Sequence, residues 1–509
     1  MKKTFFKSLM IAALVVPTFT ACELDQYPTT SIPGEKSWEK PSDATNFHKG
    51  LYSSLRANLA GSGYLWGDIL MDYFQPTISY GNRGGLLYTW TYSANDVGGP
   101  WANGFSAISD CNYFLTNVDK IDYSKSKDLA NDSILLKQYK GEAYFIRAMA
   151  YSIIASYYCP AYNAGTAATT RGLPLLTKVD VSAKPRSANL KATYEFILND
   201  LNMADNLLQA NEPAQDEAVG QLINKTMTQA LRARVLLAMG DYTNALAQAE
   251  ALINSGHFAL ANNANALKAM WTNDEGSEFI FVPAGTPDER YEYGTAVNGD
   301  NFHAYNTAAG AFSPDWIPSK ATVDMYSSND WRTKIYLDPR DVKCQDQAAS
   351  NIALFNKFLG NPNLAKKGDS KYAHYNLPKL FRIAETYLIA AEAAYRLNDA
   401  AKAQQYLNAL RTKRGLLATS ETGESLAREI RLEWKREFMG EGMYFHVLKR
   451  WGLGFQRDAT TQTGAANVVY TGEAAANIGL TVEPTFHSNW TFEIPTQEKN
   501  MNPNVTQFD

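Results

Sequence analysis

Long apolar runs are scarce in this sequence of 509 residues. Beyond residue 21, no apolar stretch approaches the roughly 18 residues that a membrane-spanning helix needs. The mostly apolar run at 9–19 is itself too short to cross a bilayer. We therefore expect the body of the chain to fold as a soluble protein.

Positive charge is also low. Lys and Arg number 48 against 52 Asp and Glu, which gives a formal net charge of −4. The first 21 residues hold three lysines and no acidic residue, so a chain without them is more acidic still. Proteins that bind nucleic acid carry a basic stripe that neutralises phosphates. The sequence therefore predicts no nucleic-acid partner.

Cysteine is rare, and the common catalytic motifs are absent. Beyond Cys22, the cysteines Cys111, Cys159 and Cys344 lie far apart with no CxxC spacing, so we expect buried free thiols and no zinc site. The six histidines form no HExxH or His-x-His pair, and no Gly-x-Ser-x-Gly elbow or glycine-rich phosphate loop occurs. The sequence predicts no metal and no cofactor. The absence of these motifs does not exclude an enzyme that lacks a recognisable motif.

The N-terminus has the pattern of an export signal. Residues 1–21 begin with lysines and continue with the short apolar run, and Ala21 then precedes Cys22. This is the arrangement of a lipoprotein, in which the cysteine after the cleavage point is acylated. We therefore expect Cys22 to be lipidated and to anchor the chain to a membrane. The alternative is an ordinary cleaved signal that a cysteine happens to follow. The polar, proline-containing residues 22–35 are expected to be an extended tether.

Two segments have the pattern of a tetratricopeptide-type helical pair. In residues 226–253, small residues recur at helical spacing on both sides of Gly240-Asp241. Small facing residues let two helices approach closely, and the Gly-Asp turn closes the hairpin. Residues 379–410 repeat the pattern around Asn398-Asp399. The copies are far apart, so this is not a plain tandem array.

Other helical patterns are separated by irregular segments. We expect a helix just after Pro41, capped by Ser42 or Asp43, and helices over 135–158 and 193–210. The irregular segments are 61–100, a major insert at about 260–375 with one strand at 278–282, and 455–509. The predicted fold is mainly α. Tetratricopeptide-like helical pairs form one scaffold, with long loop-rich inserts and a few short strands, in a single domain over 36–509.

Several segments, in this order, resemble the SusD/RagB family of outer-membrane glycan-binding lipoproteins. They are GEAYFIRAMAYSIIASYY followed by GLPLL (172–176), RIAETYLIAAEAAYRL (382–397) followed by LNALRTKRG, IRLEWKREFMGEGMYFHVLKRWG (430–452), and FEIPTQEKNMNPNVTQ (492–507). Each motif alone is weak, but together they cover nearly the whole chain after the signal. Lys413 and His446 depart from the family pattern without threatening the resemblance.

The resemblance implies a tetratricopeptide-like helical scaffold that binds oligosaccharide or polysaccharide and has no catalytic activity. It also implies a SusC-like TonB-dependent outer-membrane transporter as the partner, with this protein sitting over it like a lid. The expected place is the cell surface, at the outer membrane, through the lipid at Cys22.

Carboxylates recur four residues apart at Glu429, Glu433, Glu437 and Glu441. Paired carboxylates could act as the acid and base of glycoside hydrolysis. Beside Arg428, Arg431 and Arg436 they are more often ion pairs, so we interpret the stripe as structural. We interpret Glu385 and Glu392 with Arg382 in the same way. By the resemblance, Trp451, Asp330 and Arg332 are expected to be structural residues of the framework.

Aromatic residues gather in segments without helical period. Ten lie from Tyr64 to Phe105, and eight from Tyr291 to Trp331. Flat rings stack on the apolar faces of pyranoses, while amides and guanidinium groups bind hydroxyls. Such a site binds carbohydrate without needing charge, which suits a net-acidic chain. Many of these rings will still plug their own loops. The residues that we predict to contact a glycan are Trp66, Asn82, Arg83, Trp101, Asn103, Tyr291, Tyr293 and Trp316.

The leading hypothesis is a binding module that captures a glycan at the surface for uptake. One alternative is a surface glycoside hydrolase on a helical scaffold, which would need two carboxylates about 5–10 Å apart in an aromatic-lined cleft. Another is a tetratricopeptide scaffold that binds peptides along its concave face. Incubation with glycans followed by reducing-end analysis separates binding from cleavage.

Overall fold

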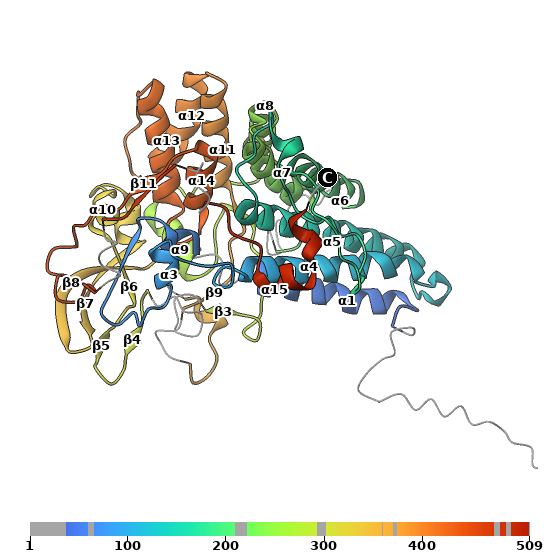
Figure 1. The fold of residues 1–509 in the computed structure, drawn as a ribbon, viewed down its shortest axis with the longest axis horizontal. Coiled ribbons are helices and arrows are strands. Elements are labelled where there is room, and N and C mark those ends of the chain that lie inside the picture. The colour runs from blue at the N-terminus through green and yellow to red at the C-terminus, as the bar shows by residue number, and fades with distance from the viewer. Residues whose placement is uncertain are drawn as a thin grey trace, which may run out of the picture.

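The computed structural model describes residues 37–59, 66–208, 221–292, 302–358, 360–369, 374–472, 479–484 and 490–507. Its helices gather on one side and at the top of the molecule, and most of its strands lie on the opposite, lower side (Figure 1). Cys22 and the predicted signal and tether lie outside the described residues. Within the described ranges, no helix combines the length and apolar character that crossing a bilayer requires.

The first half of the chain supplies a layer of long helices. They are α1 (Pro41–Ser54), α4 (Gly99–Asn117), α5 (Leu129–Tyr158) and α6 (Leu190–Leu207), with the short α2 (Trp66–Leu70) and α3 (Gly85–Tyr88) between α1 and α4. α1 runs into a π-helical turn at Leu55–Leu59. α5 packs against both α4 and α6.

Capping side chains set the helix starts. Asn189 caps α6 by accepting a hydrogen bond from the N–H of Ala192. In α1 the predicted cap is wrong, because Lys40 is the N-cap residue. Asp43 lies three residues further on, and its carboxylate accepts from the N–H of Lys40 at 3.0 Å.

The two predicted helical pairs are confirmed. α7 (Lys225–Met239) turns at Gly240, which has a φ of 74°, into α8 (Tyr242–Asn254). α11 (Ile383–Arg396) turns at Asn398, with a φ of 64°, into α12 (Ala400–Thr412). Glycine and asparagine tolerate this left-handed backbone, so the hairpins close where the sequence placed them. α11 packs against α7 and α8, which stacks one pair on the other.

The C-terminal helices α13 (Gly423–Glu437), α14 (Met443–Trp451) and α15 (Thr496–Met501) complete the scaffold, and α13 packs on α11 and α12. The mainly helical, tetratricopeptide-like fold is therefore as predicted. One hydrophobic cluster runs through it from Trp38 to Val505.

The predicted insert holds more regular structure than expected. Besides β2 (Phe279–Phe281) at the predicted strand, it contains the helices α9 (Ala264–Thr272) and α10 (Lys320–Asp324). It also contains a four-stranded sheet in the order β4 (Tyr305–Asn306), β5 (Ala311–Phe312), β7 (Leu337–Cys344), β8 (Gln347–Phe355), with only β5 and β7 parallel. A separate hydrophobic cluster lies under this sheet.

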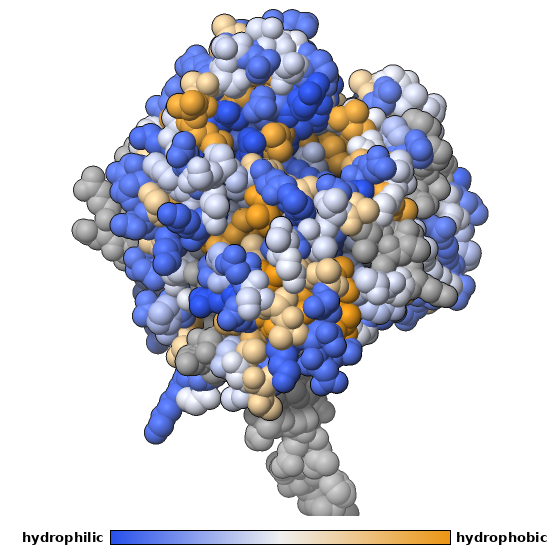
Figure 2. All heavy atoms as spheres, turned by 90° about the vertical axis from the view of Figure 1, so that its left-hand side faces the viewer, coloured by the Kyte–Doolittle hydropathy of each residue, from blue (hydrophilic) through white to orange (hydrophobic). Residues whose placement is uncertain are grey.

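The remaining strands form two-stranded pairs between distant segments. β1 (Phe74–Pro76) pairs with β6 (Trp316–Pro318), and β10 (Phe381–Arg382) pairs with β2. β3 (Tyr291–Glu292) pairs with β9 (Tyr375–Asn376), and β11 (Phe455–Gln456) pairs with β12 (Thr481–Val482). We call the four-stranded sheet and the β1–β6 pair the β region. On the molecular face that includes it, hydrophobic side chains show as small areas between hydrophilic ones (Figure 2).

A network of charges is buried in the centre of the scaffold. Glu437 of α13 bonds to Arg332 at 3.0 Å, to Arg382 at 2.8 Å and to Arg414 at 2.9 Å, and all four side chains are fully buried. Arg414 also reaches Glu278 at 2.9 Å. The structural interpretation of the glutamate stripe holds, but most of its partners come from other elements rather than from the stripe's own arginines.

Two further expected pairings are wrong in their partners. Glu385 pairs with Arg234 of α7, and Glu392 pairs with Arg450 of α14, whereas Arg382 is committed to the central network. Helical spacing predicts which residues are neighbours on one helix. The cations that pair with Glu385 and Glu392 instead come from other helices, which lie nearby only in the folded chain.

Candidate functional site

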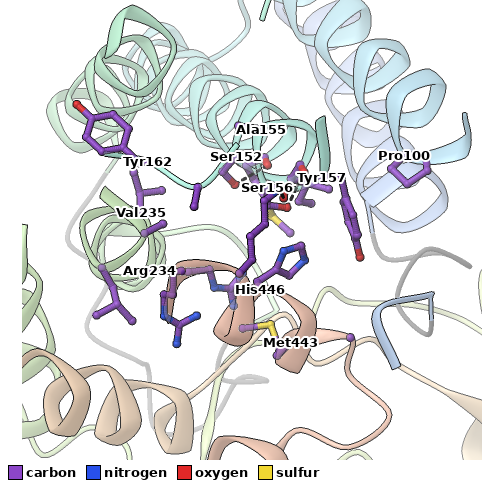
Figure 3. Close-up of a pocket in the computed structure, with 18 of the residues that line it drawn as sticks. Pro100, Ser152, Ala155, Ser156, Tyr157, Tyr162, Arg234, Val235, Met443 and His446 are labelled. Atoms are coloured by element: carbon purple, nitrogen blue, oxygen red, sulfur yellow. Dashed lines mark hydrogen bonds between the residues drawn. The ribbon is translucent and has the colours of Figure 1, made fainter. Parts of the chain in front are cut away.

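A pocket of about 200 Å³ opens where helices from both halves of the chain meet. We call it the central pocket. α4 and α5 wall one side, and α7, α11 and α14 wall the other. Figure 3 shows Ser152, Ala155 and Ser156 of α5 across from Met443 and His446 of α14. Most of its wall is apolar, with Met149, Ile153, Val235, Leu237, Leu380 and Ile389.

Two of the sequence-predicted residues, Trp66 and Asn103, line this pocket and are half-buried. Trp66 begins α2 and lies against the start of α4. A Cβ on Gly99 would be 3.1 Å from Cη2 of Trp66, so the glycine lets the ring approach the helix. Asn58 of the π-helical turn also lines the pocket, and its Nδ2 donates to Ser54 Oγ at 2.9 Å.

α2 is held closely against the turn before α14. A Cβ on Gly67 would lie 2.4 Å from the carbonyl oxygen of Gly442. Next to it, the Asp68 carboxylate accepts from the N–H of Gly442 at 2.9 Å. Burial raises the pKa of Asp68 to about 8, so this carboxyl is largely protonated at neutral pH. These contacts fix the position of Trp66.

Most charged groups of the pocket wall are neutralised by neighbours. Arg234 holds Glu385 through two bonds of 2.6 and 2.7 Å. Arg450 holds Glu392 through two bonds of 2.7 Å. Glu441 accepts from Arg382 at 2.6 Å and from Lys357 at 2.5 Å. No carboxylate on this wall is left to act as a free acid or base.

Lys449 of α14 differs from these groups. Its Nζ donates to the carbonyl oxygens of Ser156 and Cys159 at 2.8 and 2.7 Å, at the C-terminal end of α5. Burial lowers the pKa of Lys449 to about 7. Burial, and then the nearby cations Lys449 and Arg450, lowers the pKa of His446 to about 3, so this imidazole is neutral.

Trp101 does not line the central pocket. The segment expected to be a loop is the start of α4, and Trp101 is 4% exposed. Its ring packs edge-on against Tyr158, with centroids 5.1 Å apart, and it lines a second pocket that includes Leu176 and Asn502.

Asn82, Arg83 and Trp316 come together in the β region. Arg83 forms an ion pair with Asp315, the residue before Trp316, and Asn82 has a φ of 62°. Trp316 is 0% exposed, against Tyr80 and Tyr88. A ring with no accessible face cannot stack on a ligand in this conformation.

The remaining predicted positions are described only in part. Tyr291 pairs through its backbone with Asn376 in the β3–β9 ladder, and its side chain lies outside the description. Tyr293 lies outside the described residues. Among the residues that the structure does describe, no group of three or more His, Cys, Asp or Glu could hold a metal ion.

The sequence missed much of the central pocket's wall. Ser152 and Ser156 are four residues apart on the mostly apolar C-terminal part of α5, and this polar pair was a detectable signal. His446 and Lys449 lie in the segment 430–452, which was interpreted as structural, so the sequence analysis did not predict that they line the pocket.

Comparison with known proteins gives consistent matches over most of the chain. The model of the SusD family matches residues 215–509, and a model described as "Starch-binding associating with outer membrane" matches residues 46–237. SusD-like protein P38 of Formosa agariphila is 24% identical over 460 residues, which cover 82% of this chain and 83% of that protein.

Solved structures share the fold. A putative sugar binding protein from Bacteroides vulgatus matches with a TM-score of 0.72 and 24% identity, over 92% of this chain and 98% of that one. A SusD superfamily protein from Bacteroides thetaiotaomicron matches with a TM-score of 0.73 and 22% identity, over 92% and 99%. Surface glycan-binding protein A from Bacteroides uniformis matches with a TM-score of 0.67 and 18% identity, over 91% and 98%.

Proposed function

This chain belongs to the SusD family, and on that basis we propose that it binds an oligosaccharide or polysaccharide at the cell surface and delivers it to a TonB-dependent outer-membrane transporter. The observation that carries the proposal is the central pocket, where the indole of Trp66 and the amide of Asn103 border the same cavity. An aromatic face and an amide are the two groups that a pyranose ring and its hydroxyls use.

The pocket has further groups suited to a sugar. Tyr162, Ser152 and Ser156 line it together with Asn58. Ser152 and Ser156 donate their hydroxyl protons to the carbonyl oxygens of Met149 and Ile153, so their hydroxyl oxygens remain as acceptors for a sugar hydroxyl. The apolar wall excludes water around these groups, which strengthens each bond. Trp66 and Asn103 are therefore the positions at which we place the glycan.

Attachment and delivery are further parts of the proposal. Lipidation of Cys22 would anchor the protein to the outer membrane, and the tether of residues 22–35 would let the folded body reach a partner transporter. The prediction for the transporter comes from family resemblance, and the model described by outer-membrane association is consistent with it.

We propose a binding protein rather than a hydrolase. Glu385 and Glu441 both line the central pocket, but each is held by cationic neighbours. Both oxygens of each carboxylate accept hydrogen bonds from these cations, which leaves neither group placed to reach a glycosidic oxygen. The stacked helical pairs likewise leave α7 and α11 packed together, so a peptide groove has no specific support.

The test is affinity electrophoresis of the chain from residue 23 through gels that contain a panel of polysaccharides. We expect one glycan to retard the protein and expect Trp66→Ala or Asn103→Ala to abolish the retardation. Tyr123→Ala is the control, because Tyr123 is an exposed aromatic residue that does not line the pocket.

Retardation that survives both pocket variants would move the site away from Trp66 and Asn103. Absence of retardation by every glycan would contradict the proposed function itself. Reducing-end analysis of the same mixtures should detect no new chain ends, and an increase would favour the hydrolase.

A further inference from the structure

Among the described residues that line the central pocket, one cation has no carboxylate partner. Arg234 and Arg450 are each held by a glutamate, and Glu441 is held by two cations. Lys449 has no ion pair among the described residues, and its printed bonds go to two backbone carbonyls. An ammonium has three N–H donors, so one donor of Lys449 has no protein acceptor in the described part of the chain.

This cation is well placed inside the pocket. The Lys449 side chain extends from α14 to the end of α5, lines the pocket and is 5% exposed. A buried charge without an opposite charge is costly, and here the cost appears as the lowered pKa of Lys449. An anion at this place would supply the missing partner.

The groups around Lys449 do not supply that anion. His446 is neutral and Arg450 is positive on its own helix. At the end of α5, burial raises the pKa of the Cys159 thiol to about 11, so the thiol is uncharged near neutral pH. From α7, Arg234 is already paired with Glu385 of α11. The pocket is therefore locally positive in a chain whose net charge is −4.

We propose that the central pocket binds an acidic sugar unit whose carboxylate accepts a hydrogen bond from Lys449, so that the captured glycan contains uronic acid. The proposal rests on the proposed glycan-binding function and names its ligand class. A carboxylate forms a short, charge-assisted bond with an ammonium, while the sugar ring packs on the apolar wall and on Trp66.

The first test compares acidic and neutral sugars on the whole chain from residue 23. Saturation-transfer NMR with glucuronate and galacturonate, against glucose and galactose, detects the weak binding of single units. We expect the uronates to bind at least about tenfold more tightly, because an ammonium forms a stronger hydrogen bond with a carboxylate than with a neutral hydroxyl.

The second test removes the cation. Lys449→Met should abolish the preference for the uronate over the neutral sugar. Lys140→Met makes the same change of charge on α5 outside the pocket, where Lys140 pairs with Asp119, and should keep the preference. A purely structural Lys449 would lower stability without changing the preference between sugars.

A third readout needs no variant. Binding of a carboxylate should raise the pKa of Lys449 from about 7, so the complex should take up a proton at pH 8. Calorimetry in buffers of different ionisation enthalpy measures that uptake. His446 and Cys159 titrate too far from this pH to mimic it. Asp68 and Lys357 both have a pKa of about 8, so the uptake measured with a uronate is compared with that measured with the matched neutral sugar.

Equal binding of uronates and neutral sugars, or a preference that Lys449→Met retains, would overturn this inference and leave the glycan-binding function standing. Failure of every sugar and polysaccharide to bind would overturn both.

Discussion

At the scale of single residues, Asp68 makes the stability of the fold depend on pH. Its carboxyl is 0% exposed, and burial raises its pKa from 3.8 to about 8. The folded protein therefore holds a proton that the unfolded chain has released between these two values. Stability from this group is fully present below pH 3.8 and is lost as the pH rises towards 8.

We expect Asp68→Asn to be more stable than the parent at pH 8, by about 2–4 kcal/mol, and nearly equal to it at pH 4. The amide keeps the acceptor for the N–H of Gly442 and carries no charge at any pH. Urea denaturation at both values measures the difference. Asp119→Asn at an exposed site should show no such trend, and a variant gain that is independent of pH would contradict the argument.

Trp316 provides a second prediction at this scale. Its side chain is fully buried, so Trp316→Ala should lower the free energy of unfolding by about 3–5 kcal/mol. Because Trp66 is only half-buried, Trp66→Ala should lower the free energy of unfolding by less than Trp316→Ala does. It should weaken glycan binding more than Trp316→Ala does. Denaturation curves and affinity gels on both variants check this. A Trp316→Ala protein of unchanged stability that fails to bind would return the site to the β region.

At the scale of elements, the short helix α2 controls the rim of the pocket. Gly67→Ala should destabilise the protein by about 2 kcal/mol and weaken glycan binding, because the new Cβ would press on the backbone of Gly442 and shift Trp66. Gly50→Ala in α1 is the matched control. Nothing lies within 4 Å of its Cβ, so it should be neutral or stabilise by about 0.5–1 kcal/mol. Thermal denaturation and affinity gels separate the two outcomes.

The helical pairs were predictable from sequence because their signals are local. Gly240 and Asn398 lie at the turns, and the facing alanines follow the helical period. Strands that pair with a distant segment, as β1 does with β6, were less predictable because the local sequence does not reveal their partner. Two of the residues predicted from composition, Trp66 and Asn103, line the central pocket. Trp101 was misleading because it lies in the first turn of α4, directly after glycines and a proline that are typical of a loop. Trp316 was misleading because a three-residue strand is too short to reveal which face is buried.

At the scale of the whole molecule, the buried charge network joins the insert to the C-terminal helices. Its three arginines hold the pKa of Glu437 well below 4.5, against the opposing effect of burial. Stability from Glu437 is therefore present above pH 4.5 and is lost as the pH falls through the lowered value.

Glu437→Gln should lower the free energy of unfolding at pH 7 by about 3–5 kcal/mol, because it leaves buried arginines without their shared partner. Glu493→Gln, at an exposed ion pair, should change it by less than about 0.5 kcal/mol. Urea denaturation at pH 7 compares them. Similar effects for both variants would mean that the network adds little to the stability of the fold.

The walls of the central pocket come from α4 and α5 in the first half of the chain and from α11 and α14 near its end. A bound sugar would therefore bridge segments about 300 residues apart in sequence and would stabilise the native state by mass action, by about 2.7 kcal/mol at a hundredfold excess over its Kd. A glycan that binds should therefore raise the melting temperature, so a library of unlabelled glycans can be screened by thermal denaturation.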